Sequence, residues 1–216
     1  NPGGLSGYRG YFWRRAPGYH DVVVYEGNAT SGRNITHNLG VVPEMMWVKS
    51  TSHARQWAIY HKDLGNAAYL NLDDNGFPNT GESGYWNSTT PTSSVFTLGN
   101  SYDVNNSSYT YVNFLFATLA GVSKVGSVSH SGSSTDVDCG FSSGASLVML
   151  KRTDSTGDWY WWDSTSGIVA GNDPYFLLNT QDAQVTNTDL IDPLSSGFTI
   201  TDDFTDGDYI FYAIAT

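Results

Sequence analysis

The apolar residues of this chain fall in short runs bounded by polar and glycine-containing stretches, and the clearest runs come in pairs. Residues 45–49 are apolar up to a final lysine, and after a polar turn residues 56–61 form an aromatic run. Residues 147–151 and 158–163 repeat this arrangement. Apolar runs joined by a short polar turn are typical of β-hairpins. We therefore predict two hairpins, each with a strand ending in lysine and an aromatic return strand.

The spacing of the two predicted hairpins indicates an internal duplication. Lys49 and Lys151 are 102 residues apart (151 − 49), and so are Trp57 and Trp159 (159 − 57). The connecting loop therefore has one length in both copies. Further matches flank the hairpins, and their offsets change only within loops rich in Gly, Asn and Asp. Self-similarity of this kind predicts a repeated structural unit.

The turn-punctuated pattern predicts an all-β fold. Each half is expected to hold roughly seven short strands, which is typical of an antiparallel sandwich. We predict two tandem antiparallel β-sandwich repeats, jelly-roll-like and packed together, over residues 21–120 and 121–216. One larger sandwich assembled from both halves is the alternative. The composition, with 14% aromatic residues, agrees with β-structure.

Residues 1–20 are predicted to form an extended N-terminal arm. Glycines and prolines argue against a helix there, yet Tyr8, Tyr11, Phe12 and Trp13 are too apolar for a free tail. The arm is expected to dock either on its own domain or on an adjacent subunit. In the second case it would act as an oligomer clamp through a small aromatic and basic interface, namely Tyr11, Trp13, Arg14 and Arg15.

Charge and cysteine content narrow the class of partner. The formal net charge is −11, and a nucleic-acid partner would need clustered cations, so we expect none. No run approaches the roughly 20 apolar residues of a membrane span, so no membrane insertion is expected. Cys139 is the single cysteine and is predicted to be a small buried side chain. Oligomerisation is the expected source of additional stability.

The aromatic hairpins are the first candidate binding site. Along a strand, Trp159 and Trp161 share one face, and Tyr160 and Trp162 share the other. One face must be core, whereas the other is either packing or an exposed platform for stacking on sugar rings. The second hairpin is the favoured contact surface because it has more rings than one core face can use. The candidate ligand-binding residues are Trp57, Tyr60, Tyr85, Trp86, Trp159, Trp161 and Trp162.

Carboxylates supply the second candidate chemistry. Clustered Asp in β-loops can ligate Ca²⁺, and the best candidates are Asp202, Asp203, Asp206 and Asp208. Ordinary Asx turns are the favoured interpretation, so no cofactor is expected. Glycoside hydrolysis needs two carboxylates flanking a cleft, which spacing alone does not indicate. The five histidines show no zinc-ligand spacing, and no nucleophile elbow occurs. We expect no catalytic residues.

Four segments, residues 7–18, 35–40, 43–44 and 151–160, carry a resemblance to a family. They are similar to an uncharacterised domain of predicted marine tailed-phage structural proteins, often at the C-terminal end of tail or fibre-like proteins. The resemblance covers nearly the whole chain and implies a virion location. It implies no catalytic site. Trp161 and Trp162 depart from the first copy by adding aromatic bulk.

These inferences lead to one expected function and two alternatives. We expect a non-enzymatic virion protein, a tail-fibre or capsid-fibre head that binds a host surface glycan or protein. It would act as a homo-oligomer, a trimer by expectation, together with other virion proteins, and multivalency would strengthen weak single-site binding. The first alternative is a purely structural capsid-decoration or tail-assembly domain. The second is a polysaccharide depolymerase.

Overall fold

The structure, a computed structural model, describes residues 10–216. Residues 1–9, including Tyr8 of the expected arm, lie outside the described residues. The prediction of an all-β fold is confirmed, since the described chain holds sixteen strands and three short helical turns. No helix among the described residues is long and apolar enough to cross a membrane.

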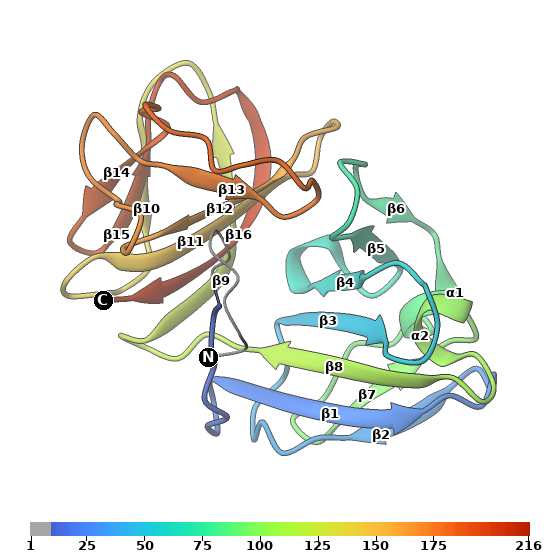
Figure 1. Cartoon of the computed structure of the whole chain (residues 1–216). Coiled ribbons are helices and arrows are strands. Elements are labelled where there is room, and N and C mark those ends of the chain that lie inside the picture. Colours follow the sequence, from blue (N-terminus) through green and yellow to red (C-terminus); the bar gives the residue numbers. More distant parts are fainter. Residues whose placement is uncertain (1–9) are drawn as a thin grey trace, which may run out of the picture.

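The first lobe contains an antiparallel six-stranded sheet and a two-stranded sheet (Figure 1). The larger sheet runs in the order β1 (His20–Glu26), β8 (Thr110–Phe116), β3 (Met45–Ser50), β4 (Ala58–His61), β5 (Ala68–Asn71) and β6 (Asn79–Thr80). The smaller sheet pairs β2 (Arg33–Thr36) with β7 (Val95–Leu98). The helical turns are η1 (Lys62–Leu64), α1 (Ser83–Trp86) and α2 (Tyr102–Asn105).

The second lobe contains an antiparallel five-stranded sheet and a three-stranded sheet. The larger sheet runs in the order β13 (Tyr175–Leu177), β12 (Trp159–Asp163), β11 (Ala145–Arg152), β16 (Gly207–Ala215) and β9 (Ser123–His130). The smaller sheet runs in the order β10 (Thr135–Asp138), β15 (Gly197–Ile200) and β14 (Ile191–Leu194).

The two lobes follow the same strand order. The larger sheets contain β1-β8-β3-β4-β5 in the first lobe and β9-β16-β11-β12-β13 in the second. In both lobes, the second strand pairs with the seventh in the smaller sheet. Each lobe thus has eight strands rather than the expected seven or so. The short strand β6 and helix α1 of the first lobe both lie within residues 73–94.

Three apolar cores hold the molecule together. One lies between the two sheets of each lobe, and the third lies between the lobes. Alternate residues of β3 divide between cores, with Met46 and Val48 inside the first lobe and Met45 and Trp47 between the lobes. The larger sheets are therefore buried on both faces. This accounts for the unbroken apolar runs in β3 and β11, since a strand covered on both sides needs no polar face.

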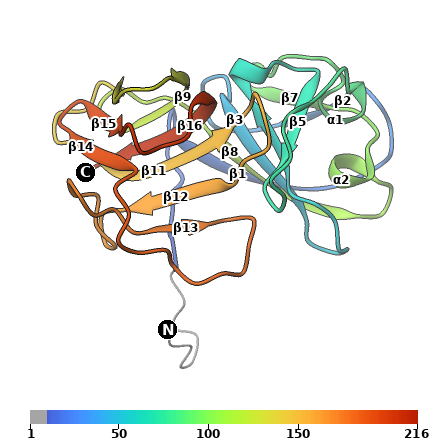
Figure 2. The same cartoon turned by 90° about the horizontal axis from the view of Figure 1, so that it is seen from above.

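The described part of the arm fills one side of the space between the lobes. In Figure 2 this segment runs behind β13, β12 and β11 of the second lobe. Tyr11 and Trp13 pack against the interlobe core, and the Trp13 ring lies about 6 Å from the rings of Trp47 and Trp161. Phe12, between them, is 97% exposed. The extended backbone thus points alternate side chains inward and outward.

Candidate functional site

The aromatic residues predicted to bind ligand lie almost entirely inside the protein. Trp57 is partly exposed, and the side chains of the other six are buried: Tyr60, Tyr85, Trp86, Trp159, Trp161 and Trp162. The indole N–H groups of Trp159 and Trp162 also have internal acceptors, Asn71 O at 2.8 Å and the Asp173 carboxylate at 2.7 Å. A buried indole with its hydrogen bond satisfied is a packing group.

The favoured role of the second hairpin as a contact surface is therefore wrong. Trp159 and Trp161 face the interlobe core, whereas Tyr160 and Trp162 face the core of the second lobe. The alternation of faces was predicted correctly. The assumption that one face is available to solvent failed because the other lobe covers it.

The four aspartates considered for Ca²⁺ do not come together as a metal site. No group of three or more His, Cys, Asp or Glu that could hold a metal occurs within residues 10–216. Asp206 accepts a hydrogen bond from the Gly132 amide at 2.7 Å, and Asp208 accepts one from the Ser129 hydroxyl at 2.5 Å. Asp202 and Asp203 are exposed in a turn. Two of the four carboxylates thus stabilise neighbouring loops and strands.

The arm residues predicted at an oligomer interface make contacts within the chain. The Tyr11 hydroxyl donates to the Asp163 carboxylate at 2.6 Å, which joins the arm to β12. Arg15 forms an ion pair with the buried Asp21 at 2.6 Å. Arg14 is exposed. Docking on the chain's own lobes was one of the two alternatives for the arm, and the homo-oligomer stays a prediction.

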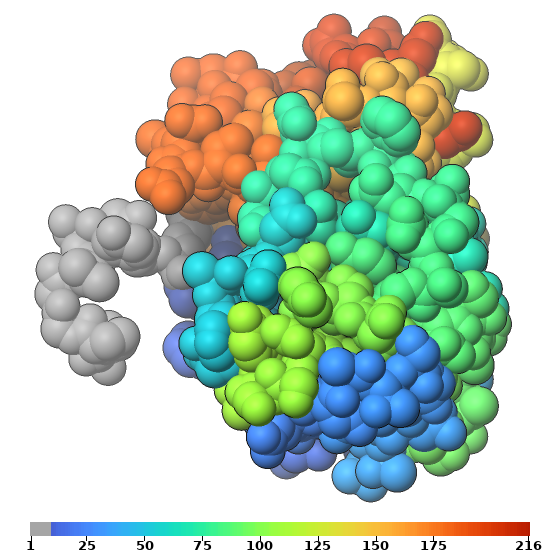
Figure 3. Space-filling view, turned by 90° about the vertical axis from the view of Figure 1, so that its right-hand side faces the viewer, coloured from blue at the N-terminus to red at the C-terminus, as the bar shows by residue number. Residues whose placement is uncertain are grey.

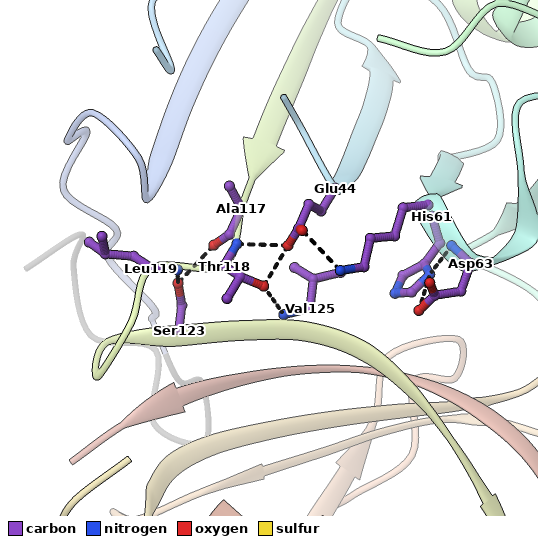
Figure 4. Close-up of polar contacts among 9 residues, drawn as sticks. Glu44, His61, Asp63, Ala117, Thr118, Leu119, Ser123 and Val125 are labelled. Carbon is purple, nitrogen blue, oxygen red and sulfur yellow. Dashed lines mark hydrogen bonds and ion pairs between the residues drawn. The ribbon is translucent and has the colours of Figure 1, made fainter. Parts of the chain in front are cut away.

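A polar seam joins the lobes beside the interlobe core (Figure 4). The Glu44 carboxylate accepts hydrogen bonds from Lys62 at 2.9 Å and from the Thr118 amide at 2.8 Å. The Thr118 hydroxyl also donates to Glu44 and accepts from the Val125 amide of β9 at 3.1 Å. Burial opposes ionisation of Glu44, but these hydrogen bonds prevail and lower its pKa. The seam therefore holds an ionised carboxylate at neutral pH.

His61 ends β4 at the same seam (Figure 4). Its side chain is fully buried, and Nδ1 accepts a hydrogen bond from the Asp63 amide at 3.3 Å, so the ring caps η1. Burial lowers the pKa of His61 to about 4 despite the nearby Asp63. The ring is neutral at pH 7, which suits a structural cap.

A partly exposed cluster of aromatic and basic side chains lies at the far end of the first hairpin. We call it the β3–β4 tip and define it by Lys49, His53, Arg55, Tyr102 and Tyr109. The Arg55 guanidinium lies over the rings of Tyr102, at 5.3 Å, and Tyr109, at 5.6 Å. The His53 ring stacks on Tyr109 with centroids 3.6 Å apart. In Figure 3 the cyan hairpin segment lies beside the yellow-green segment that leads into β8.

The loop that forms the tip is fixed by hydrogen bonds to the rest of the lobe. The Ser52 hydroxyl accepts from the Thr110 amide at 3.0 Å, and Lys49 Nζ donates to the Arg55 carbonyl. An open hollow of roughly 470 Å³ adjoins it, lined by Lys49, Ala54, Arg55, Gln56 and Asp103. The tip is therefore an ordered surface with a recess.

The corresponding tip of the second hairpin is closed by the first lobe. The lysine–tryptophan arrangement is the same in both hairpins: Lys151 Nζ donates to the Gly157 carbonyl at 2.8 Å and lies 5.9 Å from the Trp159 ring. There, however, the Gly157 amide donates to the carbonyl of Asn75, from the loop after β5, at 3.0 Å. Lys151 is fully buried beneath this contact. The first lobe thus occupies the second tip, whereas the first tip is open.

Two other hollows lie along strand β9, and their lining residues differ in charge from those of the β3–β4 tip. They measure roughly 350 and 390 Å³ and share Asp63, Ser127 and Val128. Their remaining charged lining residues are mostly acidic, namely Asp136, Asp138 and Asp208 with Lys62 and Lys124. The β3–β4 tip instead combines cations with an exposed aromatic ring, which is the combination that binding surfaces favour.

The fold and the tip define a two-lobed, all-β domain with an ordered, exposed recess at one end. The chain belongs to the family described as a domain of unknown function, DUF7483, whose model matches residues 15–216. Comparisons with curated proteins and with solved structures found no match for this chain.

Proposed function

We propose that this domain is a non-enzymatic phage virion protein that contacts the host surface through the β3–β4 tip. The observation that carries the proposal is the contrast between the two hairpin tips. The same lysine–tryptophan scaffold is filled by the protein itself in the second lobe and is open to solvent in the first. The proposed virion location is supported by the resemblance of the sequence to phage tail and fibre-like proteins.

The proposal replaces the aromatic platform expected from the sequence with a smaller site. The tip offers a ligand little more than the exposed ring of Tyr102 and the guanidinium of Arg55. Each site would therefore form few contacts and bind weakly. Several copies on one particle would compensate, because linked sites multiply the apparent affinity. The proposed partners are accordingly further copies of the chain, other virion proteins and a host surface glycan.

Adsorption experiments test this proposal. Purified chain added to host cells before phage should reduce adsorption of particles whose genome encodes it, and antibodies to the chain should label those particles. No new reducing ends should appear when the chain is incubated with host polysaccharide. Absence of the chain from purified particles would contradict the virion location, and released reducing ends would contradict the non-enzymatic role.

A purely structural role in capsid decoration or tail assembly is the second candidate. It is favoured by the continuous interlobe core, through which the two lobes pack against each other. Particles carrying Arg55→Gln distinguish the two roles. If they assemble normally but adsorb poorly, host contact is supported. If they adsorb normally, and only loss of the whole domain prevents assembly, the structural role is supported.

A further inference from the structure

We propose that the β3–β4 tip binds the carboxylate groups of an acidic polysaccharide, with Arg55 contacting the carboxylate and Tyr102 stacking on a sugar ring. The choice of a glycan as the carrier of the carboxylate rests on the proposed function. The choice of a carboxylate rests on the geometry of the tip.

Arg55 is held in a geometry that suits a planar anion. Tyr102 and Tyr109 both lie against the guanidinium, at 5.3 and 5.6 Å. Arg55 is half-buried: its Nε atom is shielded from solvent, and its side chain lines the open hollow. A planar fork of N–H donors matches the two oxygens of a carboxylate. Because the rings already restrict the side chain, less conformational entropy is lost on binding.

The tip is locally basic in a protein of net charge −11. Lys49 lies beside Arg55, because its Nζ donates to the Arg55 carbonyl. The hydrogen bond from Arg55 lowers the pKa of Tyr109, as expected beside a cation. Asp103 lines the same hollow, and one of its carboxylate oxygens already accepts a hydrogen bond from the Tyr85 hydroxyl at 3.0 Å. At physiological salt the Debye length is about 8 Å, so distant acidic groups are screened more than these neighbours.

Tyr102 offers the apolar surface that a sugar ring needs. The residue is 59% exposed, and Arg55 lies against one face of its ring. The exposed part of the ring is available for the C–H groups of a pyranose, which pack on aromatic rings. A carboxylate near Arg55 and a ring against Tyr102 are features of a uronic acid.

The second hairpin shows why this site occurs once in the described chain. Gly157 stands where the first hairpin has Arg55, at the offset of 102 residues (157 − 55). A β-carbon on Gly157 would lie 2.8 Å from the β-carbon of Arg152, so the closed tip has no room for a side chain. The arginine therefore stands at the open tip and the glycine at the closed one.

Calorimetric titration of the full chain with tetragalacturonate at pH 7 tests the inference. The methyl ester of the same oligosaccharide keeps the sugar rings but removes the charge, and it should bind at least about tenfold more weakly. Arg55→Gln should weaken tetragalacturonate binding by about tenfold or more. Arg14→Gln, which removes the same charge from an exposed position, should bind within about twofold of wild type.

A second pair of variants covers the case in which Arg55→Gln disturbs the loop. Tyr102→Ala should lose several-fold in affinity, and Tyr102→Phe should bind like wild type because it keeps the ring. Equal binding of acid and ester, or equal loss in the Arg55→Gln and Arg14→Gln variants, would overturn the inference. If dextran sulfate binds equally tightly and its binding depends on Arg55, the assignment of a carboxylate is overturned. If polyglutamate does so, the assignment of a sugar is overturned.

The outcomes for this site and for the proposed function are separable. If the chain blocks phage adsorption but does not bind tetragalacturonate, the carboxylate inference is overturned and the proposed function stands. If tetragalacturonate binds through Arg55 but the chain is absent from particles, the site stands and the proposed function is overturned.

Discussion

Lys151 is one of the residues whose side chain joins the two lobes. Its ammonium is fully buried and donates to three carbonyl oxygens, those of Asn75, Arg152 and Gly157. Burial lowers the pKa of Lys151 to about 8, although Asp74 and Asp158 oppose the shift. The first lobe therefore covers a cation whose charge is costly to bury.

This burial predicts a specific pH dependence of stability. Between the folded pKa of about 8 and the usual value of 10.5, the unfolded chain holds the Lys151 proton more tightly than the folded chain. The free energy of unfolding should therefore rise from pH 8 to pH 10, by no more than about 1.4 kcal/mol per pH unit for one proton. Urea unfolding across this range measures it. In Lys151→Met the rise should be reduced, and an unchanged slope would contradict the prediction.

The lowered pKa of His61 predicts a second pH dependence of stability, at acid pH. Its pKa of about 4 lies below the usual 6.5, so between these values only the unfolded chain is protonated there. Stability should rise with pH from 4 to 6.5 through this group. Asp173, whose pKa burial raises to about 6, acts in the opposite sense. The readout is therefore the difference from His61→Asn, which keeps a capping side chain but does not titrate.

The His61→Asn variant should show a smaller increase in the free energy of unfolding between pH 4 and 6.5 than wild type. The absolute stability of the variant is not the test, because asparagine is smaller and leaves space. If the two curves run parallel in acid, His61 does not carry the predicted linkage.

At the scale of elements, the arm acts as an aromatic wedge between the lobes. Trp13 is half-buried, and its ring contacts those of Trp47, Phe116 and Trp161. Replacing a fully buried tryptophan by alanine lowers the free energy of unfolding by about 3–5 kcal/mol. Because Trp13 is only half-buried, Trp13→Ala should lower it by about 2 kcal/mol. Phe12→Ala is the matched control, since that side chain is 97% exposed and should change stability by less than about 0.5 kcal/mol.

Chemical denaturation of the two arm variants measures this difference, and light scattering shows whether the oligomeric state changes. Because Trp13 packs on its own chain, Trp13→Ala should lower the midpoint without dissociating an oligomer. An unchanged midpoint with loss of an oligomer would instead support the arm as an intersubunit clamp.

The sequence predicted the elements better than their surroundings. The hairpins at 45–61 and 147–163 occur as predicted, because short runs and a polar turn determine them locally. What covers each face depends on contacts between distant residues, such as Ile59 with the second lobe. One local signal was nevertheless available: the apolar runs of β3 and β11 do not alternate with polar residues, which indicates strands buried on both faces.

The β3–β4 tip could be predicted only in part. Lys49, His53 and Arg55 form a visible basic cluster in an acidic chain. Tyr102 and Tyr109, however, come from a segment about 50 residues further on, and the pairing of β3 with β8 brings them to the hairpin. The register of β3 against β8 is a long-range contact, so no local sequence pattern predicts it. The closed second tip depends likewise on Asn75 of the other lobe.

At the scale of the whole molecule, the interlobe core makes the two lobes dependent on each other. It includes Met45, Trp47 and Ile59 from the first lobe and Met149, Trp159 and Trp161 from the second. Separating the lobes would expose these side chains as one continuous apolar sheet face. A contiguous patch of that kind is rare on soluble monomers and favours association.

The full chain should therefore unfold in one cooperative transition, although its strand order divides into two similar halves. In calorimetry the van't Hoff and measured enthalpies should agree, as they do for a two-state unit. Residues 121–216 produced alone should aggregate or unfold at a much lower temperature, because their larger sheet loses the cover of the first lobe. Two resolved transitions in the full chain, or a separate second lobe as stable as the whole, would show that the interlobe core contributes little. Cooperative unfolding would mean that binding at the β3–β4 tip stabilises the entire molecule, since any ligand that favours the folded state shifts the only transition available.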